Sequence, residues 1–227
     1  MEIKRSVIFN KVLISNGLTN EKLCDVLSKK RYEDKTGIGV LSVLKDGDIV
    51  HIEILIRTPT YISNYDQRAR SFTKNIVNVF DEVSIDIDTK RCVLYSTSSS
   101  TKLNKAKNFL RNEFAGKLSF DNVSLSNEKI ESWLDEAGYS HCIISMTIRK
   151  FKYNEGAEGR FSANISSQEI GEKLLKEYKD EVRNVVLSVD PEFFSPFIMQ
   201  HAQQNSISLK CEEADFWTII DFIKTKL

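Results

Sequence analysis

The chain has few of the features that mark disorder, a membrane segment or a secreted protein. Its 227 residues include only three prolines and nine glycines, which argues against long disordered tails. The longest apolar runs, such as Ile54–Ile56, are far too short to cross a bilayer. The apolar run near the N-terminus is interrupted by Asn10 and Lys11, which does not fit a signal peptide. With 41% hydrophobic and 28% charged residues, we expect a cytoplasmic globular protein.

The sequence also lacks the spacings on which common metal, nucleotide and covalent-catalysis sites are built. No glycine-rich P-loop is present, and the sequence places no nucleophile beside His51, His141 or His201. The cysteines are scattered singly, without a CxxC pair, which predicts buried reduced thiols rather than a zinc site. They are Cys24, Cys92, Cys142 and Cys211. We therefore predict no metal ion and no cofactor.

The net charge is zero, but the charges are unevenly distributed along the chain. Residues 1–117 contain 20 Lys+Arg and 14 Asp+Glu, whereas residues 118–227 contain 12 and 18. A basic half and an acidic half suggest different partners for the two halves, or complementarity between them. Chance and solvation are the alternative explanation. Because Lys117–Ser126 is polar enough to be a linker, we predict two subdomains, residues 1–117 and residues 118–227.

In the basic half, two hairpins and a helix are the clearest elements. Asp46-Gly47, a dipeptide favoured in tight turns, joins predicted strands at 40–44 and 49–56. Alternation at 83–87, a turn at 88–90 and a strand at 92–95 predict a second hairpin. A serine-rich loop then leads into a helix whose apolar stripe consists of Leu103, Ala106, Leu110 and Phe114.

The best basic and aromatic cluster lies between these hairpins. Pro59 is expected to end the preceding strand, leaving Tyr61 and Tyr65 in a loop. The spacing of Ala69, Phe72, Ile76, Val79 and Phe80 predicts a helix over 66–80. Arg70 and Lys74 lie opposite this stripe, and Arg68 lies nearer to it. Cations with aromatic rings suit phosphates and exposed bases, although a solvated helix face would have the same composition.

Lys102 and Lys105 form a second candidate site beside the serine-rich loop. Hydroxyl groups at a helix N-terminus can hold a phosphate through the helix dipole and the free N–H groups. The alternative is an ordinary capped surface helix.

The acidic half predicts a helix capped by Ser126 and strands over 142–148 and 161–165, each with alternating apolar residues. Ser166 and Glu169 form a predicted capping box. The remainder is expected to run strand (185–189), helix (191–203), strand (207–211), helix (215–226). Trp133 and Phe216 are expected to be buried. The predicted fold class is therefore α+β, with two packed subdomains of mainly antiparallel sheet and helices.

Residues 183–223 resemble the C-terminal half of restriction-endonuclease-like domains of the Mrr type. The resemblance rests on Val185–Val189, Phe194-Ser195-Pro196, Ala202, Asn205, Ile207–Leu209 and Asp215. That family needs an aspartate and a following Glu-x-Lys to hold magnesium, and no Glu-x-Lys lies on a credible strand here. The strand at 161–165, where it would be expected, contains no acid. The resemblance therefore implies an inactive relative.

The leading hypothesis is a non-catalytic protein that binds nucleic acid through its basic half. Arg68, Arg70, Lys74, Lys102, Lys105, Tyr61 and Tyr65 are the predicted contacts. The acidic half would then bind a protein partner, in a homo-oligomer or a larger assembly for DNA defence or maintenance. One alternative is a metal-dependent nuclease with Glu53, Asp86 and Asp88 as ligands. The other is a protein–protein adaptor that binds no nucleic acid.

Overall fold

A computed structural model describes residues 1–15, 17–202 and 205–227. Within this part of the chain the fold is α+β and mainly antiparallel, as predicted, with eleven strands and five α-helices. The residues group into two compact units. Unit 2 is the contiguous stretch Lys11–Asp121, and unit 1 combines Met1–Asn10 with Asn122–Leu227.

Strand β1 (Glu2–Ile14) contributes residues to both units. The strand continues through Asn10 and Lys11, the polar residues that interrupt its apolar run. Its first part, Glu2–Ile8, pairs antiparallel with the last strand of the chain. Asn10 is fully buried, and its side-chain Nδ2 donates to Asn122 Oδ1 at 3.2 Å. The polar pair therefore lies where the chain leaves unit 1 and where it returns.

Unit 2 is a sheet with the strand order β2-β3-β4-β5-β1, and β6 pairs with β1. Its strands are β2 (Ile38–Asp46), β3 (Ile49–Asp66), β4 (Ser71–Asp88), β5 (Val93–Ser96) and β6 (Leu118–Asn122), and its helices are α1 (Asn20–Ser28) and α2 (Ser100–Glu113). Thr19 caps α1 by accepting the N–H of Lys22. The predicted linker at 117–126 is wrong in part, because β6 occupies 118–122.

The core of unit 2 forms where alternating strand residues meet the apolar stripes of the two helices. Val50, Ile52, Ile54 and Ile56 of β3 are buried, as are Val83, Ile85 and Ile87 of β4. The predicted stripe of α2, Leu103, Ala106, Leu110 and Phe114, is also buried. Both hairpin predictions in this core are confirmed: β2 pairs with β3 across the Asp46-Gly47 turn, and β4 pairs with β5.

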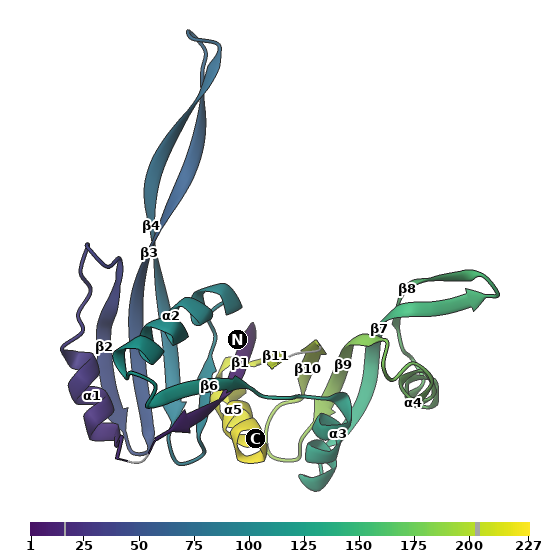
Figure 1. Cartoon of the computed structure of the whole chain (residues 1–227). Coiled ribbons are helices and arrows are strands. Elements are labelled where there is room, and N and C mark those ends of the chain that lie inside the picture. The colour runs from purple at the N-terminus through teal and green to yellow at the C-terminus, as the bar shows by residue number, and fades with distance from the viewer. Residues whose placement is uncertain (16, 203–204) are drawn as a thin grey trace. The chain divides into compact units, whose positions relative to one another are not determined.

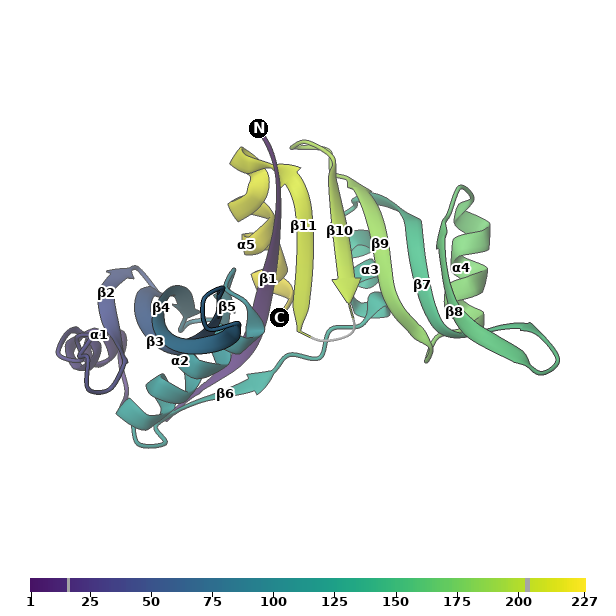
Figure 2. The ribbon, with the colours of Figure 1, turned by 90° about the horizontal axis from the view of Figure 1, so that it is seen from above.

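Unit 1 is a sheet with the strand order β1-β11-β10-β9-β7-β8. Its elements are α3 (Asn127–Glu136), β7 (Ser140–Asn154), β8 (Ala157–Asn164), α4 (Gln168–Glu177), β9 (Val182–Asp190), β10 (Phe197–Ala202), β11 (Ser206–Glu212), a 3₁₀ turn (Glu213–Asp215) and α5 (Phe216–Lys226). Figure 2 shows β11, β10, β9 and β7 side by side, with α3 behind β10 and β9 and with α4 next to β8. Ile207, Leu209 and Cys211 of β11 are buried, while Ser208 and Lys210 alternate with them.

Three sequence predictions in unit 1 are wrong in instructive ways. No helix forms over the predicted range 191–203: residues 191–196 are a loop, and 197–202 form strand β10, which pairs with both β9 and β11. The last predicted residue, Gln203, lies outside the described residues. Ile144 is bulged out of the register between β7 and β9, so Ile143 rather than Cys142 faces the core and Cys142 is exposed. Ser167, not Ser166, precedes α4, and its side chain forms no capping bond.

The buried positions predicted for helices are only partly correct. Phe216 is buried, as expected, whereas Trp133 is half-buried. Cys211 is buried and Cys24 and Cys92 are half-buried, so burial holds fully for one of the four thiols.

Candidate functional site

The most distinctive feature of unit 2 is the β3–β4 hairpin, which continues far beyond the buried core (Figure 1). Burial ends at Ile56 and Val83, and every residue from Pro59 to Phe80 is exposed. We call residues 59–80 the arm. At about 3.4 Å per residue, Pro59–Asp66 spans about 27 Å.

One side of the arm, here called the aromatic face, carries most of its rings. Antiparallel register places Tyr61 opposite Ile76 and Tyr65 opposite Phe72, with Lys74 between these two pairs. The rings of Tyr65 and Phe72 are in contact, with centroids 5.1 Å apart. Tyr61 is 69% exposed and Phe72 is 71% exposed. Such cross-strand contacts stiffen an isolated ribbon while leaving the outer ring surfaces open to a ligand.

The opposite side, the aliphatic face, continues the core side of the hairpin. It carries exposed Ile62, Val77 and Val79 among threonine and asparagine side chains. Two-stranded ribbons are marginally stable in water. The arm therefore combines considerable exposed apolar surface with little packing of its own.

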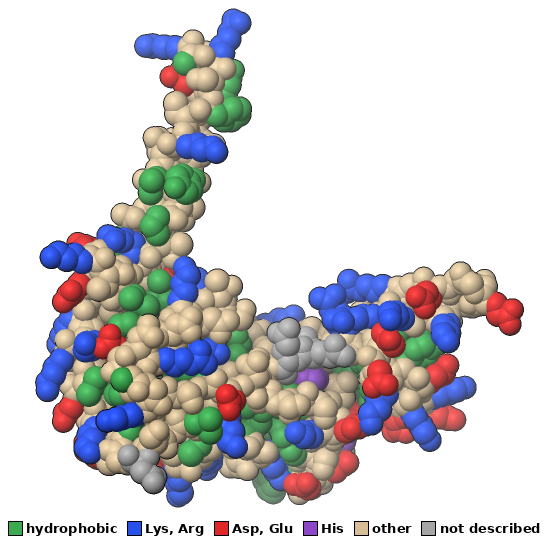
Figure 3. Space-filling view, in the orientation of Figure 1, with side chains coloured by type: hydrophobic (Ala, Val, Ile, Leu, Met, Phe, Trp, Pro, Cys, Tyr) green, Lys and Arg blue, Asp and Glu red, His purple; other side chains and the backbone are tan. Residues whose placement is uncertain are grey.

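The tip of the arm is a four-residue turn that presents two arginines. The Asp66 carboxylate accepts the backbone N–H of Arg68 at 2.8 Å and of Ala69 at 3.1 Å. Arg70 completes the turn in the left-handed region, with a φ of 47°. Figure 3 shows basic side chains at this end and hydrophobic side chains along the arm. Turn geometry thus gathers two cationic side chains at the far end of the arm, in addition to Lys74 on β4.

The helix predicted over 66–80 is therefore wrong. Tyr61 and Tyr65 lie on β3 instead of in a loop, Lys74 lies on β4, and Arg68 and Arg70 lie in the turn. The helical spacing was real, but β-branched and aromatic residues also favour strands. All eighteen residues of β4 pair with β3, which shows that this segment is a strand and not a helix. A strand period of two over 57–65 would have placed both tyrosines on one face. The same period over the returning strand places Phe72 and Ile76 on one face as well, and the register puts these two residues opposite the tyrosines.

Pro59 does not end the strand, contrary to expectation. Beyond Arg57, whose backbone N–H donates to the Gly37 carbonyl oxygen at 2.7 Å, β3 has no partner on its β2 side among the described residues. A proline lacks an N–H, so it is tolerated where the N–H side of a strand is an open edge. Pro59 pairs with Asn78 of β4 at such a position.

Lys102 and Lys105 lie on α2 at the base of the arm, not on it. Lys102 Nζ is 2.7 Å from the Asp81 carboxylate, and Lys105 Nζ donates to Thr58 Oγ1 at 2.9 Å. Ser99 precedes the helix but forms no side-chain capping bond. Both lysines are therefore engaged with β3 and β4, and they have less charge to offer a ligand than the arm residues.

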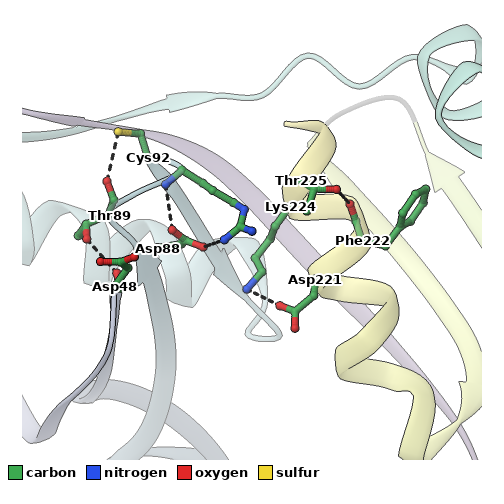
Figure 4. Close-up of polar contacts among 9 residues, drawn as sticks. Asp48, Asp88, Thr89, Cys92, Asp221, Phe222, Lys224 and Thr225 are labelled. Atoms are coloured by element: carbon green, nitrogen blue, oxygen red, sulfur yellow. Dashed lines mark hydrogen bonds and ion pairs between the residues drawn. The ribbon is translucent and has the colours of Figure 1, made fainter. Parts of the chain in front are cut away.

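The carboxylates considered as metal ligands are held by different partners. His51 Nδ1 and Asp86 Oδ1 are 2.5 Å apart across the strands, and Glu53 accepts the Ser42 hydroxyl at 2.8 Å. Asp88 is buried, where its carboxylate accepts two N–H groups of Arg91 at 2.9 Å (Figure 4). Among the described residues, no group of three or more His, Cys, Asp or Glu side chains could hold a metal ion.

Unit 1 has a pocket of about 540 Å³ near α3 and α4. Burial raises the pKa of Glu131, which lines it. His201 is also in the lining, and its Nδ1 lies 2.9 Å from Asn127 Oδ1. Glu128 of α3 and Lys179, which follows α4, form an ion pair at 2.5 Å. The pocket thus holds mixed charge rather than one uniform sign.

Comparison with known protein families and with curated proteins finds no match for this chain. No helix in the described ranges combines the length and apolarity required to span a membrane.

Proposed function

We propose that this protein binds nucleic acid without catalysing a reaction on it, and that the arm is its main contact. The observation that carries this proposal is the aromatic face, where Tyr61, Tyr65 and Phe72 are exposed around Lys74, close to the arginines of the tip. Aromatic rings stack on bases with about 1–3 kcal/mol per base, and cations neutralise phosphates.

The spacing of the aromatic face suits an extended ligand. Tyr61 and Tyr65 are four residues apart on one strand, about 14 Å, with Lys74 on the neighbouring strand between them. Stacking on the rings depends weakly on base identity, and contacts to phosphates do not depend on it at all. We therefore expect salt-dependent binding with little sequence preference.

Lys102 and Lys105 have a smaller part in this proposal. Because Lys102 already pairs with Asp81, a phosphate would have to compete with that carboxylate. We expect the loss of either lysine to weaken binding less than the loss of Arg70 or Lys74.

A second candidate function is protein docking, and the aliphatic face favours it. Ile62, Val77 and Val79 are each more than two-fifths exposed, and stacked bases would not cover this side of the ribbon. A protein partner in a larger assembly, including one for DNA defence or maintenance, would bury it.

Fluorescence anisotropy with labelled DNA and RNA, titrated at several salt concentrations, tests the proposal. The variant Arg70→Ala/Lys74→Ala removes two arm charges, and Lys11→Ala/Lys90→Ala removes two exposed charges of unit 2 outside the arm. Each lost phosphate contact should flatten the log–log salt slope by about one unit or slightly less. The control pair should keep the wild-type slope.

Equal slopes for the arm variant and the control pair would refute the proposal, as would no wild-type binding at low salt. Either result would favour the docking arm. The labelled nucleic acid should remain uncut in the presence of magnesium or manganese, and cleavage lost in Asp86→Ala would instead support the nuclease alternative.

A further inference from the structure

Unit 2 has a groove at the base of the arm with a volume of about 740 Å³. Three segments line it: the residues that follow α1, the end of the core part of β3, and the outer side of α2. The lining cations are Lys29, Lys30, Arg31, Arg57 and Lys105. Glu33 and Glu113 are the lining acids, so the groove has a surplus of positive charge.

The contacts in the groove leave part of this charge available. Lys30 Nζ is 2.7 Å from Glu113 Oε2, and Arg57 Nη2 donates to the Asp34 carbonyl oxygen at 2.6 Å. Lys29 and Arg31 are exposed, and no ion pair of either is found among the described residues. Two exposed cations in the lining of a basic groove are well placed to neutralise an anion.

Arg57 connects the groove to the arm. By strand alternation it lies on the same side of β3 as Pro59 and Tyr61, and it pairs with Phe80 of β4. The ring centroids of Phe80 and Tyr32 are 6.1 Å apart. Tyr32 lies between Arg31 and Glu33, which both line the groove. Arg57, which lines the groove, therefore lies on the aromatic-face side of β3, so the groove and the aromatic face meet at this residue.

We infer that the ligand is single-stranded, with its phosphates in the groove and its bases on the aromatic face. This inference rests on the proposed function and adds the class of nucleic acid. Bases can lie on Tyr61 and Tyr65 only when they are not stacked inside a duplex. The groove volume is in the range that holds a ligand of roughly drug size, which suits a few nucleotides and not a double helix.

The test compares a fluorescein-labelled oligo-dT with a labelled duplex of the same length. The groove variant is Lys29→Ala/Arg31→Ala, the arm variant is Tyr61→Ala/Phe72→Ala, and Lys11→Ala/Lys90→Ala is the matched charge control. All of these side chains are exposed, so far-ultraviolet circular dichroism should show the wild-type fold for each variant.

We expect oligo-dT to bind more tightly than the duplex. The groove variant should flatten the salt slope for the single strand by about 0.7 per charge, and weaken binding by about 25-fold near 0.1 M salt. The arm variant should weaken binding while keeping the slope, because stacking releases no counterions.

Different results would refute the proposed function and the inference about a single-stranded ligand. An arm variant that binds like the wild type refutes the proposed function. A groove variant that binds like the control pair, beside a weakened arm variant, refutes only the inference about the groove. Duplex binding as tight as oligo-dT binding, with both variants weakened, refutes the single-stranded ligand and retains nucleic-acid binding.

Discussion

Replacement of Phe216 by alanine should destabilise unit 1 strongly. Phe216 begins α5 and is 1% exposed, with its ring edge-on to Trp217 at a centroid distance of 5.0 Å. The Arg5 guanidinium lies 5.5 Å from the ring centroid. Truncating a fully buried phenylalanine costs about 3–5 kcal/mol in lost burial and cavity formation. We expect about 4 kcal/mol here, because the ring is buried and has contacts from more than one element.

The tryptophans make this change measurable within one unit. Trp133 and Trp217 are the only two in the sequence, and both belong to unit 1. Thermal unfolding followed by tryptophan fluorescence therefore reports on unit 1, whereas far-ultraviolet circular dichroism reports on the whole chain. For a protein of this size each kcal/mol shifts the midpoint by about 2–4 °C, so the fluorescence midpoint should fall by about 8–16 °C.

Phe193 provides the matched control, since it is the same residue type in the same unit but is 87% exposed. Phe193→Ala should change the free energy of unfolding by less than about 0.5 kcal/mol. A fluorescence midpoint that falls no further in Phe216→Ala than in Phe193→Ala would refute the assignment of Phe216 to the core.

Three further predictions concern unit 2. Replacing residues 61–76 by Asn-Gly should leave its thermal midpoint within a few degrees of wild type, because the deleted residues are all exposed; a large drop would show that the arm is packed. The pKa of Glu21 is lowered to about 2, chiefly by its hydrogen bond to Lys45. The ionised Glu21 therefore stabilises the fold fully at pH values above 4.5, its ordinary pKa, and this stabilisation is lost as the pH falls through about 2. Carboxyl titration by NMR should therefore move back towards 4.5 in Lys45→Ala, and an unmoved midpoint would contradict the pair. Gly39→Ala should reduce soluble yield far more than Gly47→Ala. A Cβ added at Gly39 would lie 2.3 Å from the Tyr32 backbone, whereas one added at Gly47 would meet nothing within 4 Å. Equal yields would show that the segment around Tyr32 can shift.

The predictable parts of the fold are those in which local pattern and burial agree. The Asp46-Gly47 turn, the alternation over 83–87 and the helical stripe from Leu103 to Phe114 all have matching core faces. In each case the apolar residues repeat with the same spacing as the side chains that face the core, so the pattern alone was sufficient to predict the element.

The arm could not be predicted in the same way because it has no core to face. With nothing buried, Phe72, Ile76 and Phe80 satisfy both a four-residue helical spacing and a two-residue strand spacing. The register that decides between them is set by pairing with β3, a strand that was predicted to end at Pro59. The sequence therefore identified the cluster of Tyr61, Tyr65 and Lys74 by its composition, but it did not predict that these residues lie on one face of a strand pair.

The bulge at Ile144 shows a second limit. One extra residue in β7 reverses which side chains face the core on either side of it, so Cys142 and Met146 point to opposite sides of the sheet despite their even spacing. Nothing in a single sequence marks such an insertion, because both registers contain apolar residues.

The division of β1 between two units has a consequence for synthesis on the ribosome. Glu2–Ile8 emerge before Lys11–Asp121, whereas their pairing partners, Ser206–Glu212, emerge only after that stretch. The stretch Lys11–Asp121 can meanwhile fold as soon as it leaves the exit tunnel, because its strands pair with one another. At roughly 5–20 residues per second, the nascent chain then carries an unpaired strand edge for several seconds. Release of chains that stop short of β11 would leave this edge open to neighbouring copies, so premature termination should yield aggregates with a folded Lys11–Asp121 core.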